Sequence, residues 1–191
     1  MKVQGTHYRS IWYDYKDCQV KIIDQRWLPH DFRIVALTNL NEFAVAIRDM
    51  WVRGAPLIGA TAAYGVAISL SDDASDSGLK NTYDTLIKTR PTAINLKWAL
   101  DRLLGALTPV SEDERPLKAL ELAHLVAEED VGINKKIGEH GLEIVKKIES
   151  KKPAGEPVRM LTHCNAGWPA TVDWGTATSP MYHAHLSLIH I

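Results

Sequence analysis

The stretch that most constrains the fold is residues 57–68, which carry no charged side chain on any helical face. Pro56 stands directly before this run, where proline suits the first turn of a helix. A helix that is apolar all round is a buried one, and its glycines and alanines let neighbouring backbones approach closely. The run is shorter than the roughly 18 apolar residues that a membrane span needs. We therefore predict a buried helix at the centre of a helical bundle.

The remaining periodicity predicts a small sheet followed by amphipathic helices. Apolar runs occur at residues 10–14, 20–24 and 32–37, and a polar turn of hairpin length separates the first two. These runs predict a small antiparallel sheet. Apolar residues at helical spacing predict helices over residues 39–50, 79–88, 92–104, 117–126 and 133–148.

A break in the pattern divides the chain into two predicted domains. Residues 153–157 read Pro-Ala-Gly-Glu-Pro, which ends the preceding helix. We predict a sheet-plus-helical domain over residues 1–152 and the first part of a second domain over residues 153–191. The fold class is α/β.

The second predicted domain opens around a lone cysteine. Residues 158–161 are mostly apolar and predict a strand, and Cys164 follows in the sequence Leu-Thr-His-Cys-Asn-Ala-Gly. Small and apolar residues after Gly167 predict a helix, with Pro169 in its first turn. A strand that turns into a helix here would place the thiol at the carboxyl edge of a sheet, where open α/β folds bind ligands. A helix N-terminus also favours a thiolate. The alternative is that Cys164 is only a small core residue, as most free cysteines are.

The turn before the uncharged helix is a candidate phosphate site. Arg53, Gly54 and Ala55 present a cation, a flexible backbone and free N–H groups at a helix start. Helix N-termini of this kind bind phosphate. A solvated arginine before an ordinary loop is the alternative.

Composition excludes several classes of protein. A net charge of −1 argues against a dedicated nucleic-acid binder. The N-terminus has no apolar core of signal-peptide length, and no apolar run has the length of a membrane span. The only cysteines, Cys18 and Cys164, form no disulfide framework, which favours a reducing cytoplasm. The spacing of His183, His185 and His190 fits no usual zinc pattern, so we predict no metal.

Three stretches together resemble one family, and they occur in the same order. They are residues 51–56 (Trp-Val-Arg-Gly-Ala-Pro), residues 89–96 (Thr-Arg-Pro-Thr-Ala-Ile-Asn-Leu) and residues 161–167. The chain resembles the 5-methylthioribose-1-phosphate isomerases of methionine salvage. That family is similar in fold to the regulatory subunits of the guanine-nucleotide exchange factor of translation initiation.

The resemblance implies a fold, a reaction and a set of site residues. It implies that the sheet and helical bundle are followed by the beginning of a Rossmann-like domain. The implied reaction is an aldose–ketose isomerisation of 5-methylthioribose 1-phosphate to 5-methylthioribulose 1-phosphate, without metal or nucleotide cofactor. Cys164 would be catalytic, Arg53, Gly54 and Ala55 would bind the substrate, and Arg90 would be a second binding cation. The full-length protein would be a cytoplasmic homodimer with a sugar phosphate as its only partner.

The chain also departs from the family pattern. The acid/base aspartate of the family belongs to a C-terminal half that is absent, and Asp173 does not replace it. Pro169 stands where an apolar residue such as leucine is expected. Residues 186–191 resemble translated sequencing adaptor. We therefore predict a C-terminally truncated chain with little or no activity of its own.

Two other functions stay open on the sequence alone. One is a non-catalytic regulatory subunit of a translation-initiation exchange factor, which would need neither Cys164 nor the two arginines. The other is a ribose-1,5-bisphosphate isomerase.

Overall fold

The structure is a computed structural model that describes residues 2–189 of the 191-residue chain. Two short strands, β1 (Lys2–Val3) and β2 (Thr6–His7), pair in an antiparallel hairpin. A second antiparallel sheet has the strand order β3-β4-β5, with β3 at Ile11–Asp14, β4 at Gln19–Ile23 and β5 at Ile34–Leu37. Ile11 lies opposite Ile22, and Ile23 opposite Ile34. The predicted antiparallel sheet is confirmed.

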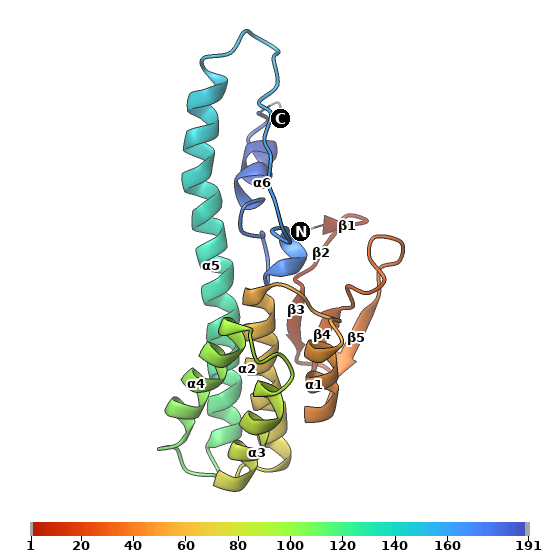
Figure 1. The fold of residues 1–191 in the computed structure, drawn as a ribbon, viewed down its shortest axis with the longest axis vertical. Helices are drawn as coiled ribbons and strands as arrows, with labels where there is room; N and C mark the ends of the chain where they lie inside the picture. The colour runs from red at the N-terminus through yellow and green to blue at the C-terminus, as the bar shows by residue number, and fades with distance from the viewer. Residues whose placement is uncertain (1, 190–191) are drawn as a thin grey trace.

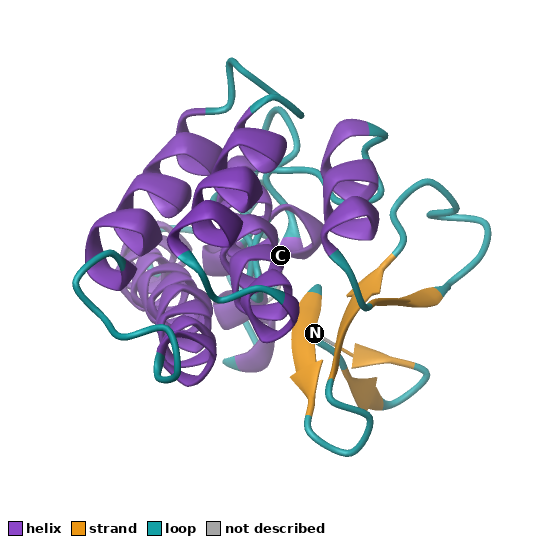
Figure 2. Ribbon diagram, turned by 90° about the horizontal axis from the view of Figure 1, so that it is seen from below, coloured by secondary structure: helices purple, strands orange, loops and turns teal. Residues whose placement is uncertain are grey.

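Helices make up most of the rest of the described chain. They are α1 (Leu40–Arg48), α2 (Ala55–Asp72), α3 (Asp76–Ile87), α4 (Ile94–Leu107), α5 (Arg115–Glu149), the 3-10 helix η1 (Trp168–Ala170) and α6 (Ser179–Leu186). Figures 1 and 2 show α2–α5 gathered into a bundle beside the strands, with α1 packed near the larger sheet. None of the helices in the described part of the chain combines the length and hydropathy that a membrane crossing requires.

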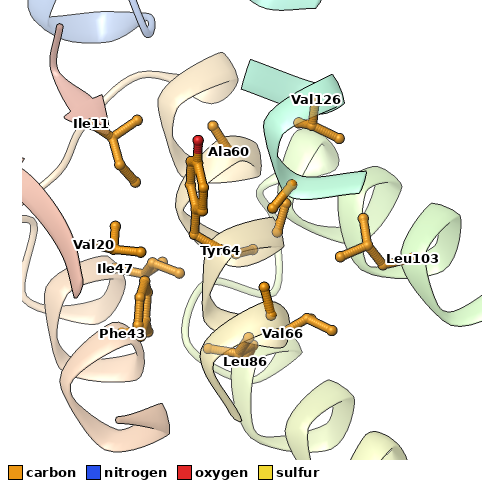
Figure 3. Close-up of a cluster of buried hydrophobic side chains, with 14 of the residues drawn as sticks. Ile11, Val20, Phe43, Ile47, Ala60, Tyr64, Val66, Leu86, Leu103 and Val126 are labelled. Atoms are coloured by element: carbon orange, nitrogen blue, oxygen red, sulfur yellow. The ribbon is translucent and has the colours of Figure 1, made fainter. Parts of the chain in front are cut away.

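Helix α2 forms the centre of the core. Nearly all of its residues from Leu57 to Leu70 are buried, as its uncharged sequence predicts. Figure 3 shows Phe43 of α1, Leu86 of α3 and Leu103 of α4 packed around it. The absence of a side chain at Gly65 lets Leu86 and Phe43 approach, since a Cβ there would lie 3.2 Å from each. The predicted buried helix is confirmed.

Helix α5 corrects the sequence analysis, which predicts two helices where the structure has one of 35 residues. The apolar spacing predicts one helix over residues 117–126 and another over residues 133–148, with the acidic residues 128–130 between them. The structure continues the helix through these residues. Arg9 forms an ion pair with Glu128, and Arg102 forms one with Glu129. Gly138 faces α6, where a Cβ would lie within 2.4 Å of side-chain atoms.

The last part of the chain runs back along α5 (Figure 1). The strand predicted over residues 158–161 is absent, because this segment has no neighbouring strand among the described residues to satisfy its backbone. The helix predicted after Gly167 is only the short η1. Val172 packs into the main core, whereas Val158 belongs to a separate small cluster with Val145 of α5. The predicted division at residues 152 and 153 stays a prediction.

The half-buried carboxylate of Asp130 connects this last segment to the middle of α5. Asp130 accepts hydrogen bonds from the backbone N–H of Val172 at 2.7 Å and from Asn134 Nδ2 at 2.8 Å. Burial outweighs these bonds and raises the pKa of Asp130 to about 6, and the neighbouring charge of Asp173 adds to the rise.

Replacing Asp130 with asparagine should therefore remove a pH dependence of stability. An ordinary aspartate has a pKa near ~3.9. Because the folded pKa is higher, Asp130 contributes stability below about pH 4, and that contribution is lost as the pH rises through 6. We expect Asp130→Asn to raise the free energy of unfolding by on the order of 2 kcal/mol near pH 7 and to have little effect near pH 4. Urea unfolding at both values measures this, and an equal effect at both would contradict it.

Candidate active site

The turn that precedes α2 is held against the end of β4. The backbone N–H of Gln25 donates to the carbonyl of Trp51 at 2.9 Å. Arg53 Nη2 donates back to the carbonyl of Gln25 at 3.0 Å. A guanidinium carries five N–H donors, so one bond to a carbonyl leaves donors for an anion. Arg53 is exposed, and its charge is therefore accessible to a ligand.

Gly54 permits a close backbone approach at the same turn. It has a φ of +95°, a conformation that side chains rarely adopt. A Cβ at this position would lie 2.2 Å from the carbonyl oxygen of Ala170. Gly54 thus brings the end of η1 directly onto the start of α2, where Ala55 is the first helical residue.

Cys164 lies in an exposed turn. It is a free cysteine with a φ of +68°, which is unusual for a residue other than glycine. Its Sγ atom lies 3.2 Å from Nδ1 of His163, and its carbonyl accepts from the N–H of Ala166 at 3.1 Å. Leu161, earlier in the same segment, is 98% exposed. The core-residue interpretation of Cys164 is therefore wrong for this structure.

One cavity joins the two turns. Its volume is about 530 Å³, which is in the range of small-molecule sites. Arg53 contributes from the first turn, and Asn165, next to Cys164, contributes from the second. The complete lining is Val3, Ile23, Gln25, Leu28, Pro29, Phe32, Arg53, Asn165, Trp168 and Pro169. The cavity combines an apolar wall with a cation and two amides.

The other predicted site residues lie outside this lining. Cys164 and Arg90 are not among the described residues that line the cavity. Arg90 is half-buried between α3 and α4, and its carbonyl accepts from the N–H of Ala93. The structure thus brings Arg53 together with the neighbour of Cys164. The roles of Cys164, Arg53, Gly54, Ala55 and Arg90 stay predictions.

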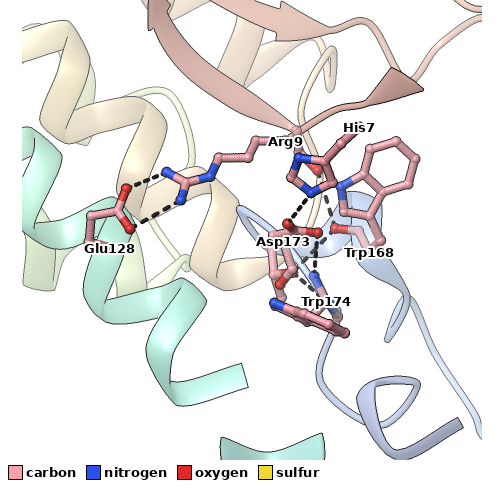
Figure 4. A network of polar contacts seen from close by, with 9 residues as sticks. His7, Arg9, Glu128, Trp168, Asp173 and Trp174 are labelled. Atoms are coloured by element: carbon pink, nitrogen blue, oxygen red, sulfur yellow. Dashed lines mark hydrogen bonds and ion pairs between the residues drawn. The ribbon is translucent and has the colours of Figure 1, made fainter. Parts of the chain in front are cut away.

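A polar network supports the segment that follows η1 (Figure 4). Asp173 is almost fully buried and accepts hydrogen bonds from His7 Nε2 at 2.7 Å and from the backbone N–H of Trp174 at 2.8 Å. Arg9 donates to the carboxylate of Glu128, and these bonds hold the pKa of Glu128 below its usual range. These bonds tie Asp173 to β2 and to its own neighbouring backbone, outside the lining of the cavity.

Histidines near the end of the described chain form no metal site. His183 Nδ1 is hydrogen-bonded to the carbonyl oxygen of Ser179, and the His183 ring packs against the ring of Trp174. Residues 2–189 contain no group of three metal-binding side chains. His190 lies outside the described residues.

Sequence reasoning missed Gln25, Phe32 and Trp168 as cavity residues. Gln25 directly follows a predicted strand and precedes the break at Pro29. A polar residue at the end of a buried strand is the one local signal that could have marked it as a candidate. No local pattern marked Phe32 or Trp168.

Comparison with known proteins identifies the class. The initiation factor 2 subunit family matches residues 51–190, and the chain belongs to this family. Within it, the chain is similar to a methylthioribose-1-phosphate isomerase of Escherichia coli O45:K1, with 57% identity over 97% of this chain and 50% of the relative. The chain spans about half the length of the curated relatives it matches.

Two solved structures share the fold. The 5-methylthioribose 1-phosphate isomerase of Pyrococcus horikoshii OT3 has a TM-score of 0.83 and 33% identity, covering 100% of this chain and 54% of that one. The translation initiation factor eIF-2B subunit delta of A. fulgidus has a TM-score of 0.81 and 38% identity, covering 96% and 52%. The predicted fold class and family resemblance are confirmed.

Proposed function

We propose that the whole protein containing this chain isomerises 5-methylthioribose 1-phosphate to 5-methylthioribulose 1-phosphate. The observation that carries the proposal is the cavity that joins the Arg53 turn to the Asn165 turn. The E. coli relative, named as a methylthioribose-1-phosphate isomerase, supports the substrate class.

The proposed roles follow from the chemistry of each residue. Arg53 binds the phosphate, because a guanidinium forms charge-assisted and often bidentate bonds with phosphate oxygens. Gly54 and Ala55 place backbone N–H groups at the start of α2 beside it. Arg90 supplies a second cation when the sugar phosphate is bound. The apolar wall of the cavity accommodates the methylthio end of the substrate.

Cys164 is the proposed catalytic residue. Isomerisation moves hydrogen between C1 and C2, which requires a hydrogen-bonding or proton-transferring group beside those carbons. The thiol of Cys164 lies beside the imidazole of His163, so the exposed turn offers two such groups. The resemblance also implies an acid/base aspartate that residues 1–191 do not include. We expect low turnover from residues 1–191 alone.

Protection of Cys164 from alkylation tests the proposal. The experiment uses the whole protein, and peptide mass spectrometry measures the alkylation of Cys164 separately from that of every other thiol. We expect 5-methylthioribose 1-phosphate to slow the reaction of Cys164 with iodoacetamide several-fold. Ribose 1,5-bisphosphate and GDP should give no protection at the same concentration. Protection by the bisphosphate alone would favour the bisphosphate isomerase, and no protection by any of them would favour a non-catalytic subunit.

We also propose that the whole protein is a cytoplasmic homodimer. Both cysteines are free and exposed, which suits a reducing compartment. Ile133 and Ile144 of α5 are each about 60% exposed and present apolar surface of the kind that interfaces cover. The sedimentation mass of the whole protein tests the dimer.

A further inference from the structure

We infer that Gln25 is a positioning residue that sets the spacing between the phosphate-binding Arg53 and the Cys164 turn. The inference rests on the proposed function. It concerns a side chain to which that function assigns no role.

Gln25 is bonded to both halves of the candidate site. Its backbone carbonyl accepts from Arg53 Nη2 at 3.0 Å. Its side-chain Nε2 donates to the carbonyl of Pro169 at 2.5 Å. Pro169 lies in η1, directly after the turn that carries Cys164. One residue thus spans the gap between the two turns.

Burial restricts the motion of the Gln25 side chain that connects the two turns. Gln25 is only 5% exposed, and its backbone N–H is fixed to the carbonyl of Trp51. A buried polar side chain without its partner carries a desolvation cost, so the bond to Pro169 is retained. The two bonds hold Arg53 and η1 at one fixed separation. A ligand that touches both turns then meets a preformed site rather than ordering a loop.

The two hydrogen bonds of Gln25 use different parts of the residue, so a substitution at position 25 removes only one of them. The bond to Arg53 uses the backbone carbonyl, which any residue at position 25 retains. The bond to Pro169 uses the side chain, which a substitution removes. Replacing the side chain should therefore leave phosphate binding at Arg53 intact and loosen only the Cys164 turn.

The test compares Gln25→Met with Ser10→Ala, both made in the whole protein. Methionine has a similar shape to glutamine but cannot donate to Pro169. Ser10 Oγ donates to the carbonyl of Trp168 at 3.2 Å, so Ser10→Ala removes a bond to the same η1 helix without touching the Arg53 turn. Thermal melts establish that both variants fold.

Two readouts separate positioning from general stability. For Gln25→Met, we expect the dissociation constant of inorganic phosphate to stay within about twofold of the parent. We expect the protection of Cys164 by 5-methylthioribose 1-phosphate to fall about three- to tenfold, as suits the loss of one buried hydrogen bond. Ser10→Ala should change neither by more than about twofold.

Each outcome has one meaning. Parent-like protection in Gln25→Met, or an equal loss in Ser10→Ala, overturns the inference and leaves the proposed function standing. A parallel loss of phosphate binding in Gln25→Met also overturns it, because the Arg53 end would then depend on the side chain. Absence of protection in the unsubstituted whole protein overturns the proposed function, and the positioning role falls with it.

Discussion

Replacing Gly54 with alanine is expected to lower the free energy of unfolding by about 3 kcal/mol or more. Two costs add at this position. A side chain at a φ of +95° is strained by about 1–2 kcal/mol. The new Cβ would also lie 2.2 Å from the carbonyl oxygen of Ala170 and 2.4 Å from its Cα, and these are backbone atoms that cannot rotate away. Urea unfolding followed by tryptophan fluorescence measures the loss.

Two other glycines serve as controls, one for the backbone strain alone and one for a site with neither strain nor a steric clash. Gly155 has a φ of +84° with no atom within 4 Å of a built Cβ, so Gly155→Ala should show the strain alone, about 1 kcal/mol. Gly105 lies inside α4 with open space around it, and Gly105→Ala should stabilise the chain by up to about 1 kcal/mol. Equal losses in Gly54→Ala and Gly155→Ala would show that η1 does not press on the start of α2.

Local sequence predicted those elements whose cause is local. The burial of α2 follows from the absence of charge between residues 57 and 68, which leaves no face for water. The first two strands of the larger sheet follow from apolar runs with a polar turn between them. In both cases the information lies within about twenty residues of chain.

Elements that depend on distant contacts were not predictable in the same way. In α5, Glu128 pairs with Arg9, which lies 119 residues away in sequence, and no local pattern reveals this partner. The apolar run at residues 158–161 looks like a strand, but no described strand lies beside it to accept its hydrogen bonds. Local pattern cannot report whether a partner is present.

The candidate site shows the same limit. The Arg53 turn and the Cys164 turn were each recognisable from their own residues. Their junction was not, because Gln25 meets Arg53 across 28 positions and Pro169 across 144. A buried glutamine that joins two turns has no sequence signature of its own. Its role becomes visible only when the fold brings the three segments together.

Replacing Arg53 with methionine should weaken the binding of 5-methylthioribose 1-phosphate on the order of a hundredfold. Methionine keeps most of the apolar length of arginine but removes the charge and all N–H donors. Each hydrogen bond to a charged group contributes about 1.5–3 kcal/mol, and a guanidinium can make two of them to one phosphate. Isothermal titration calorimetry measures the change, and raised salt should weaken binding in the parent far more than in the variant.

Arg48→Met is the matched control for that prediction. Arg48 is an exposed arginine at the end of α1, paired with Asp49 and outside the cavity lining. Its replacement removes the same charge from the chain but should change the affinity by less than about twofold, since Arg48 is paired with Asp49 and does not line the cavity. If Arg53→Met bound the substrate as tightly as the parent, the phosphate would not bind at the Arg53 turn. Equal weakening in both variants would mean that Arg53 acts only through net charge, because a bound phosphate must distinguish the guanidinium that contacts it from one outside the cavity lining.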